Sequence, residues 1–274
     1  MMIARITVLS AIAAGMVLGD GKPGTGRAKA DWLTASSSAL PGQPLQTAIR
    51  IRHDKHWYSY WLNPGEAGMP TTVEWKLPPG WKHGEPGFPA PVGFLTSGLA
   101  SYGHVGELLL PVTITPPEDF IGTAKLEAEI SWLACSNDGC VPGEAALSLE
   151  VTAGDPLPGP AAAEILAAID LLPRPAGESL RLSVEETENS LVLTLIPGKS
   201  APADLSQHEV FPLTTEVIDP KTRIRFAPGG QNWTATVPKS EFAASPLKEL
   251  TLVLADRKHP PLQVTWNPPS RKSH

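Results

Sequence analysis

Short runs of alternating apolar and polar residues, divided by turn residues, dominate the chain from residue 31 to residue 151. Such alternation over four to eight residues is typical of a β-strand with one buried face. The clearest runs predict strands over residues 45–51, 71–75, 107–114, 126–132 and 145–151. Because short strands joined by Pro- and Gly-containing turns favour a sandwich, we expect residues 31–153 to form a β-sandwich.

The pattern changes after residue 153. Residues 154–178 are rich in Pro, Gly and Ala, and only residues 161–172 have a helical pattern, so we expect a linker with a short docking helix. Residues 179–274 return to short apolar runs with Pro or Gly between them, which predict a second, smaller β domain. Its expected strands are residues 180–184, 190–196, 216–218, 223–226, 232–237 and 249–255.

The N-terminus has the pattern of an export signal. Arg5 precedes an apolar run from Ile6 to Leu18, which is shorter than a membrane span. A small-x-small sequence ending at Ala30 indicates cleavage before Asp31, so we expect residues 1–30 to be a signal peptide and the protein to be periplasmic. An ordinary apolar N-terminal helix is the alternative. No later window reaches 18 uninterrupted apolar residues, so we expect no membrane span in the mature chain.

Composition narrows the class of protein further. Without residues 1–30 the chain has 18 basic and 27 acidic residues, a net charge of −9. A chain this acidic is unsuited to nucleic acid, so we expect no nucleic-acid partner. The 30 prolines and 24 glycines fit strands joined by many turns better than helices.

The two cysteines, Cys135 and Cys140, are the strongest candidates for chemistry. The pair lacks the further Cys or His ligands of a structural zinc site, which leaves a local disulfide, a redox pair or two separate buried thiols. A disulfide closing about six residues stabilises a fold by only about 2 kcal/mol, against about 4.7 kcal/mol for a loop of about 100 residues. The spacing therefore favours neither a redox pair nor a structural disulfide decisively.

Four motifs in the first half occur in an order that resembles a known family. They are His56–Gly68, Ser101–His104, Leu109–Val112 and Trp132–Pro142. Together they resemble the N-terminal periplasmic domain of the thiol:disulfide interchange protein DsbD, in the variety found in ScsB, over about residues 31–153.

The resemblance implies an immunoglobulin-like fold and an activity of the protein-disulfide reductase type, without a cofactor. It implies that Cys135 and Cys140 are the redox pair and that Tyr102 and Gly103 belong to a loop that caps them. Its partners would be a membrane electron-donor protein and periplasmic thioredoxin-like proteins. By analogy we expect Cys140 to form the first mixed disulfide and Cys135 to resolve it.

Two departures from the family pattern concern access to the sulfurs. The loop between the cysteines is one residue shorter than in the best-known members, and Ser101 stands where they carry an aromatic residue. From the sequence, Asp138 and Glu144 are expected to raise thiol pKa values, and a protonated His104 to lower them. Tyr102 could equally be a core or hairpin aromatic. For His104 the sequence favours a surface loop role over a role beside the thiols.

Two other functions remain open at this point. One is a non-catalytic binding or assembly module with a structural disulfide. The other is a copper-binding protein of the copper-tolerance type, which would use the thiols of Cys135 and Cys140 with a nearby His. Separately, His53 and His56 could bind a metal with His83 or His104. Because residues three apart on a strand point to opposite faces, the first two histidines are a poor ligand pair, and we expect no metal site.

Overall fold

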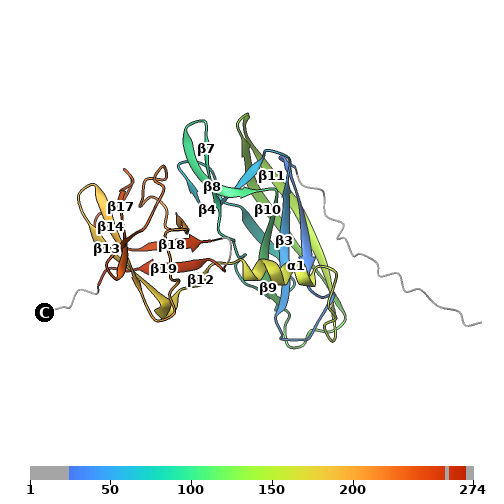
Figure 1. The fold of residues 1–274 in the computed structure, drawn as a ribbon. Coiled ribbons are helices and arrows are strands. Elements are labelled where there is room, and N and C mark those ends of the chain that lie inside the picture. The colour runs from blue at the N-terminus through green and yellow to red at the C-terminus, as the bar shows by residue number, and fades with distance from the viewer. Residues whose placement is uncertain (1–24, 257–258, 270–274) are drawn as a thin grey trace, which may run out of the picture.

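The computed structural model describes residues 25–256 and 259–269. In its N-terminal half two β-sheets pack face to face (Figure 1). The first sheet has the order β1-β3-β9-β6. These strands are β1 (Ala28–Thr34), β3 (Leu45–His53), β9 (Glu107–Thr115) and β6 (Lys82–His83).

The second sheet has seven strands, in the order β2-β11-β10-β4-β8-β7, with β5 also paired to β10. They are β2 (Ser38–Ala39), β11 (Gly139–Ala153), β10 (Thr123–Ser136), β4 (Tyr58–Gly65), β8 (Leu99–Val105), β7 (Val92–Thr96) and β5 (Thr72–Lys76). The β7–β8 hairpin and the tip of the β10–β11 hairpin lie at the same end of the sandwich (Figure 1).

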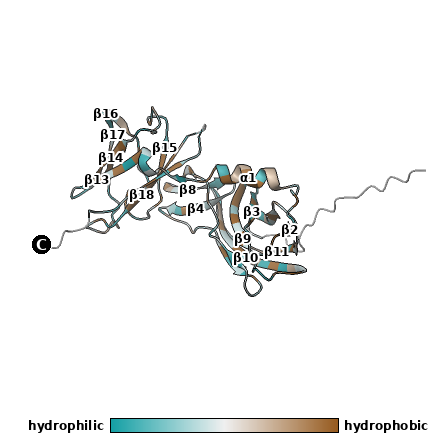
Figure 2. Cartoon of the chain, turned by 90° about the horizontal axis from the view of Figure 1, so that it is seen from below, coloured by the Kyte–Doolittle hydropathy of each residue, from teal (hydrophilic) through white to brown (hydrophobic). Residues whose placement is uncertain are grey.

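Alternating burial over residues 126–134 of β10 and 143–151 of β11 builds the core between the sheets. Figure 2 shows hydrophobic and hydrophilic residues alternating along both strands. On β10 the buried residues include Ile130, Trp132 and Ala134, and the residues between them face the other side of the sheet. The period of two thus decides, for every residue of these strands, whether it faces the sandwich core.

The C-terminal half contains two four-stranded sheets, β12-β19-β18-β15 and β13-β14-β17-β16, around a second hydrophobic core. The first comprises β12 (Arg174–Pro175), β19 (Leu262–Trp266), β18 (Leu250–Ala255) and β15 (Glu209–Pro212). The second comprises β13 (Leu180–Glu186), β14 (Ser190–Pro197), β17 (Asn232–Pro238) and β16 (Ala227–Gly229), and a 3-10 turn, Gly177–Ser179, precedes β13.

Two of the strands expected in this half are wrong. Residues 216–218 and 223–226 are irregular and make only single bridges, through Ile218 and Ile224. Both side chains are buried, so the apolar signal was real, but Glu216 has a positive φ of 59°, which breaks an extended run. The sequence pattern missed β15 and β19, which instead complete one of the sheets.

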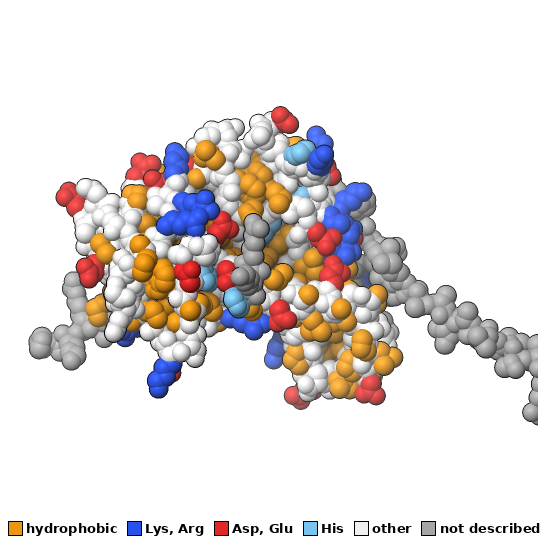
Figure 3. Space-filling view, in the orientation of Figure 1, with side chains coloured by type: hydrophobic (Ala, Val, Ile, Leu, Met, Phe, Trp, Pro, Cys, Tyr) orange, Lys and Arg blue, Asp and Glu red, His pale blue; other side chains and the backbone are white. Residues whose placement is uncertain are grey.

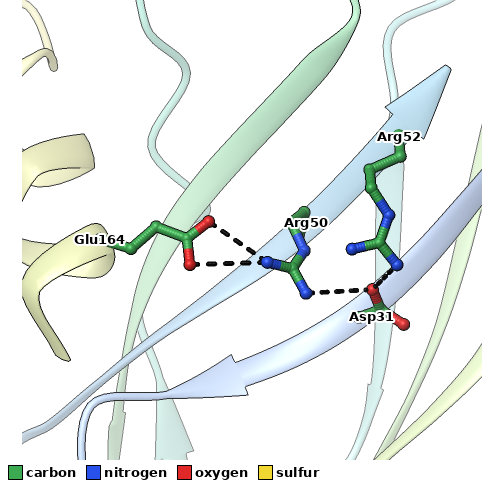
Figure 4. Close-up of polar contacts among 4 residues, drawn as sticks. All are labelled: Asp31, Arg50, Arg52 and Glu164. Carbon is green, nitrogen blue, oxygen red and sulfur yellow. Dashed lines mark hydrogen bonds and ion pairs between the residues drawn. The ribbon is translucent and has the colours of Figure 1, made fainter. Parts of the chain in front are cut away.

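The helix expected in the linker is present as α1 (Ala162–Asp170), which lies against the outer face of the four-stranded sheet. Its Ile165 is fully buried, and Figure 4 shows its Glu164 pointing at Arg50 of β3. Arg50 Nη1 lies 3.3 Å from Glu164 Oε1, and Nη2 lies 3.4 Å from Asp31 Oδ2 on β1. Arg52 also pairs with Asp31. One largely buried guanidinium therefore ties the helix to two strands.

The expected signal peptide falls mostly on residues 1–24, which lie outside the described residues. Residues 25–30, however, are part of the sandwich. Ala28 and Ala30 are buried in β1, opposite His53 and Ile51, and Trp132 Nε1 donates a hydrogen bond to the carbonyl of Gly26. A boundary after residue 30 would cut β1, so the folded domain begins before Asp31.

No helix within the described residues is long and apolar enough to span a membrane. On the face shown in Figure 3, Lys and Arg side chains lie beside Asp and Glu side chains, and the coloured residues of that face form no continuous basic surface. A phosphate backbone would meet mixed charge on this face.

The start of the fold can be tested by truncation. A chain that begins at Asp31 loses the burial of two alanine methyl groups and the hydrogen bond from Trp132, which together contribute about 2–3 kcal/mol. Compared with a chain that begins at Thr25, we expect a melting temperature lower by roughly 5–10 °C, measured by circular dichroism. Equal melting temperatures would show that residues 25–30 do not stabilise the sandwich.

Candidate functional site

The β10–β11 hairpin brings the two cysteines together. Cys135 and Cys140 are directly opposite each other in the antiparallel register, with Cα atoms 4.1 Å apart, and their sulfurs form a disulfide. Only Asn137 and Asp138 separate the paired ends of the strands, and the backbone N–H of Asp138 donates to Ser136 Oγ at 3.1 Å. The short loop thus places both side chains on the same face of the sheet.

That face is the outer one, opposite the sandwich core. Trp132 and Ala134 point into the core, so Leu133 and Cys135 point outward. On the neighbouring strand β4, Tyr58 is paired with Cys135 and therefore points outward as well. Tyr58, Tyr60 and Cys135 form a small buried cluster of their own, with Leu133 and Phe94 packed against it.

The two sulfur-bearing residues differ strongly in access. Cys135 is completely buried, whereas Cys140 is exposed. A thiolate from another molecule can therefore approach Cys140, and Cys135 would be the leaving group. Exchange requires a reachable sulfur, and this arrangement offers one on Cys140.

Tyr60 contacts the disulfide directly. Its hydroxyl donates a hydrogen bond to Cys135 Sγ at 3.1 Å and lies 4.0 Å from Cys140 Sγ. Burial, and then the neighbouring Tyr58, raise the pKa of Tyr60 far above its usual value. The phenol therefore stays protonated near neutral pH and can donate a hydrogen bond to a Cys135 thiolate.

An aromatic cover lies over this cluster. Phe94 of β7 stacks on Tyr58, with ring centroids 4.5 Å apart and planes 17° from parallel. The Tyr58 hydroxyl donates to Thr96 Oγ1 at 3.2 Å, which ties the ring to the same hairpin. No periodic pattern in the sequence marked Phe94, because β7 is a short edge strand and the contact of Phe94 with Tyr58 of β4 is set by tertiary structure.

The two expected cap residues, Tyr102 and Gly103, face opposite sides of the sheet. Gly103 lies opposite Tyr60, and a side chain there would meet Ser59 O at 2.2 Å, so glycine lets the two strands approach. Tyr102 points to the inner face, where its ring packs edge-on to Phe211 at 5.7 Å and its hydroxyl donates to Pro220 O at 3.2 Å. The tyrosine beside the sulfurs is Tyr60.

His104 also lies on the inner face of the sheet. Burial is the main cause, and His53 an additional one, of a pKa of about 4 for His104. Within the described part of the chain, its Nε2 has no hydrogen-bond partner. A histidine that is neutral near pH 7 and faces away from the disulfide does not act there as a cation beside Cys140.

The other expected modulators are exposed. Asp138 is in the turn itself, and Glu144 is four residues from Cys140, about 13 Å along the strand.

His53, a candidate metal ligand from the sequence, hydrogen-bonds to Ser59 Oγ at 2.8 Å and to Gly106 O at 2.9 Å. The described residues contain no group of three or more His, Cys, Asp and Glu side chains that could hold a metal ion.

Comparisons with known proteins identify a family and a similar fold. Residues 29–152 match the family described as thiol:disulfide interchange protein DsbD, N-terminal. The structure is similar to the crystal structure of the N-terminal periplasmic domain of ScsB from Proteus mirabilis, with a TM-score of 0.62 and 18% sequence identity over 92% of this chain and 96% of that chain. The predicted all-β, immunoglobulin-like fold and the predicted resemblance are thereby confirmed.

Other similarities are weaker. The sporulation control protein Spo0M from Bacillus subtilis has a TM-score of only 0.23 and 10% identity, over 89% of this chain and 91% of that chain. No curated protein sequence matches the chain.

The role of Tyr60 can be tested in the reduced protein. Replacing Tyr60→Phe removes a hydrogen bond to the Cys135 thiolate, so we expect the pKa of Cys135 to rise by about one to two units. The measurement is a pH titration of thiolate ultraviolet absorbance. Tyr58→Phe is the matched control, because the Tyr58 hydroxyl bonds to Thr96. Equal pKa values in Tyr60→Phe and the unmodified protein would contradict this role.

His104 should make the fold sensitive to acid. Its folded-state pKa lies below the ordinary value of 6.5, so the unfolded chain binds the proton more tightly. The contribution of His104 to the free energy of unfolding is therefore fully present above pH 6.5, and about 3 kcal/mol of it is lost as the pH drops to about 4. We expect His104→Gln to flatten this slope in urea titrations, and His83→Gln, on the exposed β6, to preserve it. If the free energy of unfolding of His104→Gln depends on pH as steeply as that of the unmodified protein, His104 is not the cause of the acid sensitivity.

Proposed function

We propose, on the premise that residues 29–152 are a DsbD N-terminal-like domain, that this protein is a thiol-disulfide exchange module that relays electrons through Cys135 and Cys140. The observation that carries the proposal is the disulfide between the exposed Cys140 and Cys135, which is buried beneath aromatic side chains. A purely structural disulfide needs neither an accessible sulfur nor a hydrogen-bond donor beside the other sulfur.

The reaction begins with reduction of the disulfide. A thiolate of a donor dithiol attacks Cys140 Sγ, forms a mixed disulfide and expels Cys135 as a thiolate, which takes up a proton. The second thiolate of the donor then attacks the mixed disulfide and releases Cys140. The donor dithiol is oxidised to a disulfide, and the Cys135–Cys140 bond is reduced to two thiols.

The second half of the cycle runs in the opposite direction. The Cys140 thiolate attacks the disulfide of a partner, and Cys135 resolves the mixed disulfide, so that two electrons pass to the partner. Tyr60 donates a hydrogen bond to Cys135 whenever that residue is the leaving or attacking thiolate. No cofactor enters this chemistry.

The proposed partners are a membrane electron-donor protein and periplasmic thioredoxin-like proteins. Support comes from the surface around the site, where Val92, Leu99 and Val105 are exposed on the same side of the sheet as Tyr58 and Tyr60. Exposed apolar side chains beside a reactive group favour contact with another protein. A partner protein that packs against these apolar side chains can displace the aromatic cover. Other thiols lack this contact, and the cover stays over the cluster when they approach.

Export to the periplasm is part of the same proposal. The apolar run of residues 6–18 has the length of a signal peptide core, and a disulfide persists in an oxidising compartment. The strand pairing of Ala28 and the hydrogen bond from the Thr25 N–H to the carbonyl of Glu144 favour a cleavage site upstream of Thr25 rather than before Asp31.

The proposal is tested by trapping mixed disulfides. Cys135→Ala leaves the exposed Cys140 without its resolving thiol, so it should accumulate a mixed disulfide with a thioredoxin-like protein whose own resolving cysteine is replaced. Cys140→Ala leaves the buried Cys135 and should trap at least tenfold less, because only a reachable thiolate reacts. Non-reducing electrophoresis and mass spectrometry measure the adduct.

A static disulfide module predicts a different result, since it would trap no partner through either cysteine. The double variant Cys135→Ala/Cys140→Ala is the control for non-covalent association. Absence of an adduct with both single variants, or equal trapping by both, would overturn the proposed roles.

A further inference from the structure

The C-terminal half touches the same two strands that carry the aromatic cluster. On the inner face of β4 and β8, Phe211 packs edge-on to Trp61 at 6.4 Å and to Tyr102 at 5.7 Å. Tyr58 and Tyr60 point outward from β4, on the opposite side of this contact. One layer of strands separates the two contacts, and Trp61 lies three residues along β4 from Tyr58, which is paired with Cys135.

Strand β4 is irregular at this point, and the chain folds back onto Tyr60. The register between β4 and β8 shifts between Tyr60 and Gly65, and Pro70 then forms a bridge with Tyr60. A Cβ on Gly68 would come within 2.3 Å of the Tyr60 ring, so this glycine lies on the ring itself. We call residues 65–70 the cover segment, because it lies over the tyrosine that contacts Cys135.

Asn63 joins the cover segment to the C-terminal half. Its side chain is buried, and its Nδ2 donates to the carbonyl of Pro212 at 2.8 Å and to that of Thr214 at 3.4 Å. Gly65 is the first residue of the cover segment, and its N–H donates a hydrogen bond to Asn63 Oδ1 at 3.0 Å. The side-chain amide of Asn63 therefore links the cover segment to the backbone that follows Phe211.

Glu66 makes a second connection. Its Oε2 accepts the N–H of Ala100 at 2.6 Å, its own N–H donates to the carbonyl of Ala100 at 2.9 Å, and its Oε1 pairs with Lys221 Nζ at 3.0 Å. Ala100 is in β8, in the hairpin that carries Phe94. The cover segment, this hairpin and the C-terminal half thus meet at one carboxylate.

We propose that the C-terminal half of the chain, through Asn63 and the Glu66–Lys221 pair, positions the cover segment and the β7–β8 hairpin around Tyr60 and Cys135. Tyr60 would then limit how closely thiols approach the Cys140 sulfur from its own side. The inference rests on the proposed function only in taking this disulfide as the reactive group. Asn63, Glu66 and Lys221 are positioning residues, because they act through Tyr60 and the β7–β8 hairpin and do not touch the sulfurs.

The contacts differ in strength, which guides the choice of variants. The Glu66–Lys221 pair is partly exposed, and such pairs contribute little when simply removed, so charge reversal with Lys221→Glu is the sharper change. Arg223→Glu is the matched control, since Arg223 pairs with Glu209 inside the C-terminal half. Asn63→Ala is the second variant, because it removes a buried connection.

The experiment measures how fast dithiothreitol reduces the disulfide in the full chain. In this reaction the dithiol is oxidised to its cyclic disulfide, and Cys135–Cys140 becomes two thiols. We expect the rate to rise about fivefold in Lys221→Glu, and at least as much in Asn63→Ala, as the cover loosens. Faster amide exchange at Glu66 and Ala100 should accompany the change. Arg223→Glu should react like the unmodified protein.

Unchanged or lower rates in Lys221→Glu would overturn the inference, as would an equal increase in Arg223→Glu. If Asn63→Ala does not fold, the comparison of the two charge reversals decides alone. The result is independent of the trapping experiment, because dithiothreitol needs no protein partner. If a mixed disulfide is trapped but the dithiothreitol rates of the variants are unchanged, only the positioning role is refuted. If the rates change but no mixed disulfide is trapped, only the electron relay is refuted.

Discussion

The rest of the site depends on the register of one antiparallel hairpin. Because side chains alternate between the two faces of a sheet, Trp132 and Ala134 can fill the sandwich core only if Leu133 and Cys135 face outward. The pairing of β10 with β11 then sets Cys140 directly opposite Cys135. A slip of one residue would bury the disulfide in the core and expose a tryptophan, so burial of the core holds the sulfurs on the outer face.

An outward-facing cysteine is exposed unless other side chains cover it, and here the cover is unequal. Tyr58 and Tyr60 of β4 bury Cys135, and Phe94 of β7 stacks on Tyr58, whereas Cys140 lies beyond them at the edge of the cluster. This asymmetry gives the two sulfurs different chemistry although they share one bond. It also explains how an aromatic cover can exist without an aromatic residue at position 101, since Phe94 supplies the ring from the paired strand.

Long-range polar contacts hold the elements around this site. Arg50 ties the linker helix α1 to two strands of the first sheet, and Asn63 ties the irregular part of β4 to the backbone of the C-terminal half. Buried or half-buried donors of this kind are costly to leave unpaired, so each fixes the relative position of the segments that it joins. The C-terminal half is therefore connected to the strands of the candidate site by more than the linker.

The sequence alone determined the features that depend on local pattern: the alternating strands, the short hairpin between the cysteines and the choice of this pair as the candidate chemistry. The prediction of strands over residues 216–218 and 223–226 was wrong, because Ile218 and Ile224 are buried without continuous strand pairing. Tertiary structure alone decided that Tyr60, rather than Tyr102, lies beside the sulfurs, and that one sulfur-bearing residue is exposed. Those outcomes depend on which strands become neighbours and which face each presents, and such contacts join residues dozens of positions apart that no local pattern links.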